Sequence, residues 1–442
     1  MARVPEFRAL WLAELLSILG DQLARVALAV LVYGRTSSAM LAALTYALTF
    51  APAVLGGAFL SGLADRFPRR AVLVVTDVVR AVLAALMALP GVPLGVLWTF
   101  VALLSMASGP FKAAQLSLLP TVVGKEQYVS AMSLRAASTQ VAQLAGFACG
   151  GLLLAVVPPA AVLGLNAGTF ALSALIVLTG VRARPAVAAQ PEEPVSRPDA
   201  PVAPFAGVLP IFAMVMLVGL FVVPEGLAAP YGDALGAGPV GVGLLMAADP
   251  LGSALGAWLL ARRGSTPTWH SMVLLAALAG VPLLFCSAGP ALVPSLILWA
   301  VTGGLSTAYL IQAQALLVEL VPDQRRGLVM GRLATSLYTS QGLAVVLGGA
   351  LSELTGPFRA VGGAGLLGVV LASCVGVWWG RGRSRAENDR AEPHMTDDDQ
   401  MPLMRISGTS SRTDTSADGD TRPASPPIGG QGRPLSTSND GD

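Results

Sequence analysis

Runs of about twenty apolar residues recur along nearly the whole chain, and this pattern constrains the fold more than any other feature. The hydrocarbon core of a bilayer is about 30 Å thick, so a helix needs roughly twenty apolar residues to cross it. Backbone polar groups must also be paired inside the bilayer, which favours helices. The chain is 54% hydrophobic and 12% charged, whereas about a quarter of the residues in a soluble domain are charged. The sequence therefore predicts an all-α membrane protein.

We expect twelve transmembrane helices in two sets of six. Residues 181–207 are rich in proline and have the composition of a linker between the sets. Residues 381–442 are rich in Ser, Thr, Asp and Gly, which predicts a disordered tail. The predicted domains are 1–180, 181–207, 208–380 and 381–442. Spans are expected near 7–33, 39–62, 71–91, 94–119, 131–157, 161–180, 208–230, 239–261, 271–288, 291–320, 328–353 and 360–380.

The placement of lysine and arginine predicts the orientation, because both are retained in short cytoplasmic loops. They cluster in alternate loops of this chain, and the loops of the other set contain only Arg35 and Arg359. Both termini are therefore expected in the cytoplasm. The richness in Ala and Gly is typical of a bacterium with high GC content, so we predict a multi-pass protein of the bacterial plasma (inner) membrane.

An internal repeat supports two related halves. When the fifth predicted span is laid on the eleventh, Ser138 falls on Ser336 and Gln143 on Gln341. The pairs Gly150–Gly151 and Gly348–Gly349 also coincide. Two six-helix halves related by such a repeat, with a binding site between them near the midplane, are a known transporter architecture. We therefore expect two pseudo-symmetric halves.

Charged residues inside spans are costly and are candidates for coupling or substrate binding. Six stand out: Asp21, Arg25, Asp77, Arg80, Glu225 and Asp249. Asp21 and Arg25 are four residues apart, and Asp77 and Arg80 are three apart, so each pair shares a helix face and can neutralise itself. Asp21 lies about 20 Å along its helix, near the midplane. It is a candidate for proton coupling if Arg25 moves towards or away from it, and a static ion pair is the alternative.

The second half offers Glu225 and Asp249. Glu225 stands between Pro224 and Gly226, which predicts an interrupted helix beside a cavity. A solvated glutamate at the membrane interface is the alternative. Asp249 has no partner nearby in the sequence, so its partner must come from another helix or its carboxyl must be neutral.

Six uncharged polar side chains are candidates for lining the cavity, although hydrogen bonds between helices explain such residues equally well. They are Gln140, Gln143, Gln312, Gln314, Tyr338 and Gln341. The sequence contains no phosphate-binding loop and no His, Cys or Glu cluster with metal spacing, so we predict neither a metal nor a cofactor. The formal net charge is only +2, which gives no indication of a nucleic acid partner.

The loop SGLADRFPRR, residues 61–70, resembles the signature loop of the major facilitator superfamily. Asp65, Arg66, Arg69 and Arg70 match that signature, while Ser61 and Pro68 replace its two glycines. The resemblance implies a gating loop, in which a carboxylate binds the N-terminus of a neighbouring helix and latches two rocking units in one state. The alternative is that the arginines only anchor the loop on the cytoplasmic side.

Three further stretches are similar to the twelve-span drug and siderophore exporters of that superfamily, the branch with macrolide and enterobactin exporters. They are LGDQLARVAL, DVVRAVLAAL and GFACGGLL, at 19–28, 77–86 and 146–153. This resemblance implies a monomeric secondary active transporter that exports a small amphipathic or apolar compound in exchange for protons. An importer or facilitator of a polar metabolite or lysophospholipid is the main alternative, and a membrane receptor is a second one. An enzyme is least favoured, because the sequence has no recognisable nucleophile and base pair.

Overall fold

The computed structural model describes residues 4–60, 62–124, 127–185, 208–264 and 267–391, and these residues form helices joined by short connections. The unit Met1–Glu387 is compact and contains all the features discussed below. The linker predicted at 181–207 lies mostly outside the described residues, as does the predicted tail beyond 391. The last helix runs on to Ala391, past the predicted end of the last span at 380.

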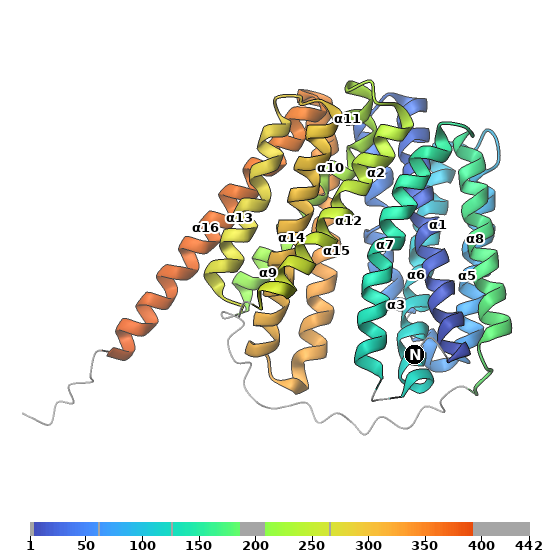
Figure 1. Ribbon diagram of the computed structural model, residues 1–442, viewed down its shortest axis with the longest axis horizontal. Helices are drawn as coiled ribbons and strands as arrows, with labels where there is room; N and C mark the ends of the chain where they lie inside the picture. Colours follow the sequence, from blue (N-terminus) through green and yellow to red (C-terminus); the bar gives the residue numbers. More distant parts are fainter. Residues whose placement is uncertain (1–3, 61, 125–126, 186–207, 265–266, 392–442) are drawn as a thin grey trace, which may run out of the picture. The chain divides into compact units, whose positions relative to one another are not determined.

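The first half consists of the helices up to α8, drawn blue to green in Figure 1. The second predicted span is divided between α2 and α3, because Pro52 has no N–H group to continue the hydrogen bonding of α2. The helices are α1 (Pro5–Thr36), α2 (Ala39–Ala47), α3 (Ala51–Leu60), α4 (Leu63–Arg66), α5 (Arg69–Met87), α6 (Leu94–Val123), α7 (Tyr128–Leu154) and α8 (Pro159–Gly180).

The second half begins with a span in three pieces. The interruption predicted beside Glu225 occurs at Leu227, between α10 and α11, where Pro230 cannot donate a backbone hydrogen bond. The helices are α9 (Leu209–Met216), α10 (Val218–Gly226), α11 (Ala228–Ala234), α12 (Gly238–Arg263), α13 (Trp269–Cys286), α14 (Leu292–Leu320), α15 (Asp323–Thr355) and α16 (Pro357–Ala391).

Within the described residues, ten helical segments are long and apolar enough to cross a membrane. The other two predicted spans correspond to α5 and α15, which are as long but carry more charged and polar residues. Large apolar side chains such as Val141, Leu274 and Val293 are exposed on the outside of the bundle. Lipid contact explains this exposure, since lipid tails are as apolar as these side chains.

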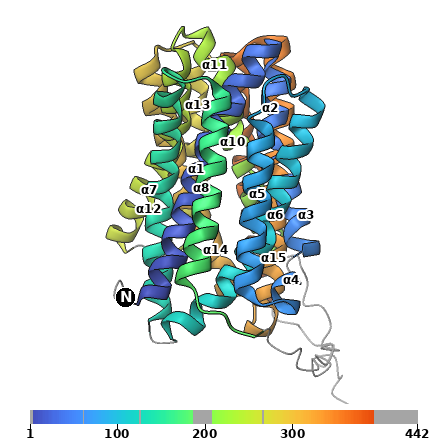
Figure 2. The same ribbon diagram turned by 90° about the vertical axis from the view of Figure 1, so that its right-hand side faces the viewer.

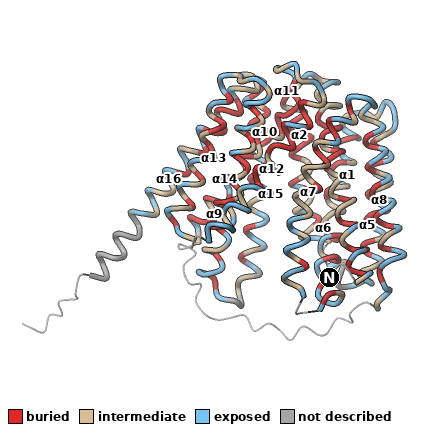
Figure 3. Tube along the Cα trace, in the orientation of Figure 1, coloured by how far each residue is buried: buried red, intermediate tan, exposed pale blue. Residues whose placement is uncertain are grey.

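We call the end of the bundle where α1 begins the basic end, and the opposite end the far end. Arg66, Arg69, Arg70, Arg182 and Arg184 lie at the basic end. Within the first half, α8 packs between α1 and α5 (Figure 2). Buried residues concentrate where α2, α10, α11 and α12 meet (Figure 3).

The two halves touch along two equivalent helix pairs, α7 with α12 and α2 with α15. Gly150 faces α1 and Gly151 faces α12, while Gly348 faces α10 and Gly349 faces α2. The matched glycines therefore make matched contacts, one within their own half and one across to the other. A Cβ on Gly151 would lie only 2.8 Å from the Cα of Gly243. The repeat noticed in the sequence thus corresponds to a structural pseudo-symmetry between the halves.

Candidate substrate cavity and ion-pair network

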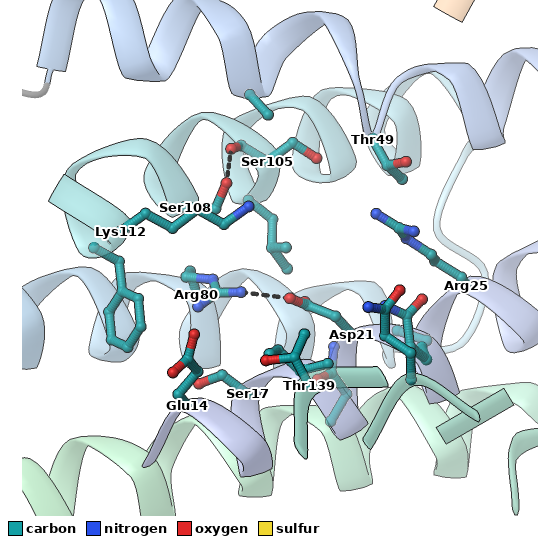
Figure 4. A pocket seen from close by; sticks show the side chains of 18 of the residues that line it. Glu14, Ser17, Asp21, Arg25, Thr49, Arg80, Ser105, Ser108, Lys112 and Thr139 are labelled. Carbon is teal, nitrogen blue, oxygen red and sulfur yellow. Dashed lines mark hydrogen bonds and ion pairs between the residues drawn. The ribbon is translucent and has the colours of Figure 1, made fainter. Parts of the chain in front are cut away.

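A cavity of about 660 Å³ lies among α1, α6 and α7, with Tyr338 of α15 contributing from the second half. Its volume falls within the range of about 300 to 1,000 Å³ that is usual for small-molecule sites. Residues spaced three or four apart along α1 face it, namely Glu14, Ser17, Asp21 and Arg25 (Figure 4). This spacing is the signature of one helix face. The first predicted span therefore carries a polar stripe into the cavity.

Asp21 and Arg80 form the central ion pair of the first half. Arg80 Nη2 lies 2.7 Å from Asp21 Oδ2, and Arg80 Nη1 lies 3.2 Å from Asp77 Oδ1. Asp77 also accepts a hydrogen bond of 2.5 Å from Ser173 of α8. The guanidinium of Arg80 stacks on the ring of Phe170, at 4.0 Å from its centroid. One arginine thus joins two carboxylates, and the group ties α1, α5 and α8 together.

The pairing predicted between Asp77 and Arg80 is present, but the one predicted between Asp21 and Arg25 is wrong. Asp21 is held by Arg80, whose side chain reaches from α5 to α1 although α8 packs between these two helices. Arg25 instead lies over the rings of Tyr46 and Phe50, at 5.5 and 5.6 Å from their centroids. Helix spacing showed correctly that Asp21 and Arg25 share a helix face, but the ion-pair partner of Asp21 comes from another helix, α5.

A second ion pair, missed in the sequence, lies nearer the basic end. Arg135 of α7 donates a hydrogen bond of 2.5 Å to Glu14 and one of 3.2 Å to Gln115 of α6. Glu14 lies inside the first apolar run, and its place on the same helix face as Asp21 and Arg25 was the signal that could have identified it.

In the second half, the carboxyl groups of Glu225 and Asp249 hydrogen-bond to each other. Tyr46 of the first half donates its hydroxyl hydrogen to Glu225, and Ser253 donates one to Asp249 at 3.4 Å. The partner that Asp249 required from another helix is therefore Glu225. A polar contact between the halves has formed around two half-buried carboxyl groups.

The signature loop folds into α4 and the start of α5. Arg69 donates a hydrogen bond of 2.9 Å to the carbonyl of Ser117, and Arg70 donates one to the carbonyl of Leu178. Arg66 is exposed. The side chain of Asp65 lies outside what the structure describes, so its predicted gating role stays a prediction.

The uncharged candidates divide into two groups. Gln140, Gln143 and Tyr338 line the cavity, and Gln143 donates a hydrogen bond of 3.0 Å to Gln140. Gln312, Gln314 and Gln341 do not line it. Gln312 accepts a hydrogen bond from Ser271, which joins α14 to α13. For Gln312 the alternative of a helix-to-helix hydrogen bond is therefore the correct one.

At the far end, polar contacts join the halves. Glu353 of α15 accepts hydrogen bonds from the Ser38 hydroxyl at 2.5 Å and from the Met40 backbone N–H at 3.0 Å. Tyr33 of α1 donates one of 3.4 Å to Asp233 of α11. The far end is closed by these contacts and by the glycine approaches of α7 and α15.

The model of the Major Facilitator Superfamily matches residues 10–308 and, in a second match, residues 227–428. The chain belongs to the Major Facilitator Superfamily. It is a multi-pass membrane transporter of that type, and such transporters bind small-molecule substrates within the membrane.

Solved structures share its fold at low sequence identity. A bacterial homolog of the human lysosomal transporter Spinster, in an inward-facing and occupied conformation, has a TM-score of 0.66 and 15% identity. That match covers 84% of this chain and 95% of the other. The nucleoside transporter NupG has a TM-score of 0.65 and 16% identity, with 83% of this chain and 98% of the other covered.

A curated relative is also similar over a shorter stretch. The uncharacterized MFS-type transporter YjbB of Bacillus subtilis (strain 168) is 31% identical over 170 residues, which is 37% of this chain. The chain spans 42% of the length of that relative.

Proposed function

We propose that this transporter moves a small amphipathic molecule across the membrane by alternating access of its two halves, coupled to protons. The observation that carries the coupling is the carboxyl pair Glu225–Asp249 within the spans. Two carboxyl groups hydrogen-bond to each other only when at least one of them holds a proton. The pair therefore supports a role as the site that binds and releases the coupling proton.

The contact with Tyr46 would link this proton to the rocking motion. Tyr46 belongs to α2 of the first half, and its hydroxyl donates to Glu225 of the second half. Opening of the far end would separate the halves and break this hydrogen bond. Because a hydrogen bond to a carboxylate changes how firmly the group holds a proton, the pair would bind its proton differently in the two states.

The cavity supports an amphipathic cargo better than a wholly apolar one. Charged and polar side chains of α1 and α7 form one wall, whereas Leu28, Met87, Val101 and Leu104 supply apolar surface. This lining also favours the second candidate, an importer or facilitator of a polar metabolite. Efflux in exchange for protons, a monomer, the bacterial inner membrane and a cytoplasmic basic end all stay predictions.

Flux into proteoliposomes with an imposed pH gradient tests the proposal. A panel of labelled compounds would first identify a cargo and the direction of its gradient-driven movement. Asp249→Asn is then expected to abolish accumulation driven by the gradient while exchange of labelled for unlabelled cargo continues. Glu319→Gln changes an exposed carboxylate of α14 and serves as the matched control.

Asp21→Asn tells the two candidate coupling sites apart. If the proton is carried by Glu225 and Asp249, this variant retains gradient-driven accumulation, although its affinity for cargo changes. Wild-type accumulation in Asp249→Asn, together with its loss in Asp21→Asn, would transfer the coupling role to Asp21. No gradient-dependent flux of any compound would favour the receptor alternative.

A further inference from the structure

We propose that the cargo is an amphipathic organic anion, and that Arg25 binds its anionic group. The proposal rests on the proposed function in one respect, because it takes the cavity among α1, α6 and α7 as the substrate site. It adds the sign of the cargo's charge and the residue that recognises it.

The carboxylates that face the cavity are already occupied. Glu14 is bound by Arg135 at 2.5 Å, and Asp21 is bound by Arg80 at 2.7 Å. A cationic cargo would have to displace an arginine from one of them. Such an exchange of ion pairs gains little, because the displaced guanidinium would be left without its partner in a site of low dielectric.

Two cations in the cavity are available instead. In the described part of the chain, neither Arg25 nor Lys112 has a carboxylate within 4.0 Å. The lining carries four cationic side chains, Arg25, Arg80, Lys112 and Arg135, against the carboxylates of Glu14 and Asp21. Asp77 lies behind Arg80 and reduces this positive excess without removing it. The field in the cavity therefore favours an anion.

Arg25 has the geometry of an anion-binding side chain. Its guanidinium carbon lies over the rings of Tyr46 and Phe50, at 5.5 and 5.6 Å from their centroids. A guanidinium has five N–H donors and binds carboxylate or phosphate with two parallel hydrogen bonds. Among the described residues these donors have no hydrogen-bond acceptor, and Arg25 lines the cavity. An arginine left without partners inside a span is costly unless a ligand or water satisfies it.

One candidate acceptor within the protein, the carboxyl group of Glu225, is engaged elsewhere. Glu225 attracts Arg25 electrostatically, but its carboxyl group is hydrogen-bonded to Tyr46 and to Asp249. Tyr46 therefore contacts both groups, because Arg25 lies over its ring and its hydroxyl donates a hydrogen bond to Glu225 Oε2.

Lys112 marks a path to Arg25. It lies on α6 one turn from Gln115, at the level of the Arg135–Glu14 pair and nearer the basic end than Arg25. Figure 4 shows Lys112 and Arg25 pointing into the pocket. An anion entering from the basic end would meet Lys112 first and then Arg25. The apolar body of the cargo would pack against Leu28 and Leu104.

A pair of fluorescent probes with the same aromatic body tests the inference. Anilinonaphthalene sulfonate carries a negative charge, and N-phenylnaphthylamine lacks the sulfonate. Binding of each probe to the purified transporter in nanodiscs would be measured, with empty nanodiscs subtracted and no pH gradient present. We expect the sulfonate probe to bind at least about tenfold more tightly than the uncharged probe.

Arg25→Gln should weaken binding of the sulfonate probe about tenfold and leave the uncharged probe unchanged, and Arg25→Lys should weaken it less. The matched control is Arg35→Gln, since Arg35 also lies on α1 but binds the carbonyl of Val92 at the far end. Retained binding of the uncharged probe shows that a variant is folded.

Three outcomes would overturn the inference. The first is equal affinity of the wild type for the two probes. The second is an equal loss of affinity for both probes in Arg25→Gln. The third is a loss of affinity for the sulfonate probe in Arg35→Gln as large as that in Arg25→Gln. Probe binding is measured without a pH gradient, so it does not depend on proton coupling. A failed prediction for Asp249→Asn would therefore not affect the conclusion about the anionic cargo. A failed probe experiment would likewise not affect the conclusion about proton coupling.

Discussion

Replacement of Glu353 by alanine is expected to loosen the closure of the far end. Glu353 belongs to α15 of the second half, yet it accepts hydrogen bonds from Ser38 and Met40 at the start of α2 in the first half. Ser38 is itself the N-cap of α2 and accepts a hydrogen bond from the N–H of Leu41. A carboxylate of one half therefore completes the N-terminal cap of a helix in the other, and any opening of the far end must break this contact.

The size of the effect follows from capping energies. Loss of an N-cap side chain costs about 1 kcal/mol, and a negative charge near a helix N-terminus contributes about 0.3 to 1 kcal/mol. Glu353 is exposed, so solvent and salt screen its charge. We therefore take about 1 kcal/mol for Glu353→Ala, which corresponds to a shift of roughly fivefold towards the far-open state. Glu353→Gln keeps the shape but not the charge, so its smaller effect should shrink as salt is added.

Distances between spin labels measure this equilibrium. Val156, after α7, and Ala288, between α13 and α14, are exposed at the far end of the first and second half. Labels at these positions require replacement of the three native cysteines, Cys149, Cys286 and Cys374. The population at long distance should rise about fivefold in Glu353→Ala. An unchanged distance distribution, or the same shift in the control Glu319→Gln, would refute the role of Glu353 in closing the far end.

Two further substitutions, each paired with a control, have defined outcomes. A Cβ at position 151 would lie only 2.8 Å from the Cα of Gly243. Gly151→Val should therefore keep α7 and α12 apart, and the same labels should report a far end that cannot close. Gly168→Val, where a Cβ would meet nothing within 4 Å, should leave the distances unchanged. Arg80→Gln leaves two carboxylates without their cation, and breaking such a buried pair costs about 3 to 5 kcal/mol. Thermal unfolding in detergent should show a clear loss of stability, whereas Arg35→Gln should unfold close to the wild type.

The helices of this transporter could be predicted because each span is a local property of the sequence. Apolar length and internal hydrogen bonding decide that a segment crosses the membrane as a helix, whatever its neighbours are. The sequence repeat also identified which glycines are equivalent, and Gly151 and Gly349 do make equivalent approaches to the opposite half. The proline-linked interruption near Glu225 was local as well, and it occurs at Leu227.

The partners of charged side chains could not be predicted in the same way. Spacing predicts a pair only when both members lie on one helix, as Asp77 and Arg80 do. Asp21 is bound by an arginine from another helix, and Glu225 by a tyrosine from the other half. These contacts depend on how helices distant in the sequence pack, which no single-helix pattern contains. The same limit explains why Arg25 was expected to neutralise Asp21 and instead lies against aromatic rings.

This difference in partners also bears on where proton coupling resides. Asp21, Arg80 and Asp77 lie on α1 and α5, so when the halves rock these residues move together and keep their contacts. Tyr46 and Glu225 belong to different halves, so their hydrogen bond must break whenever the far end opens. A coupling site has to bind its proton differently in the two states. Only a carboxyl whose surroundings change between the states can do so, and this condition favours Glu225 and its partner Asp249 over Asp21.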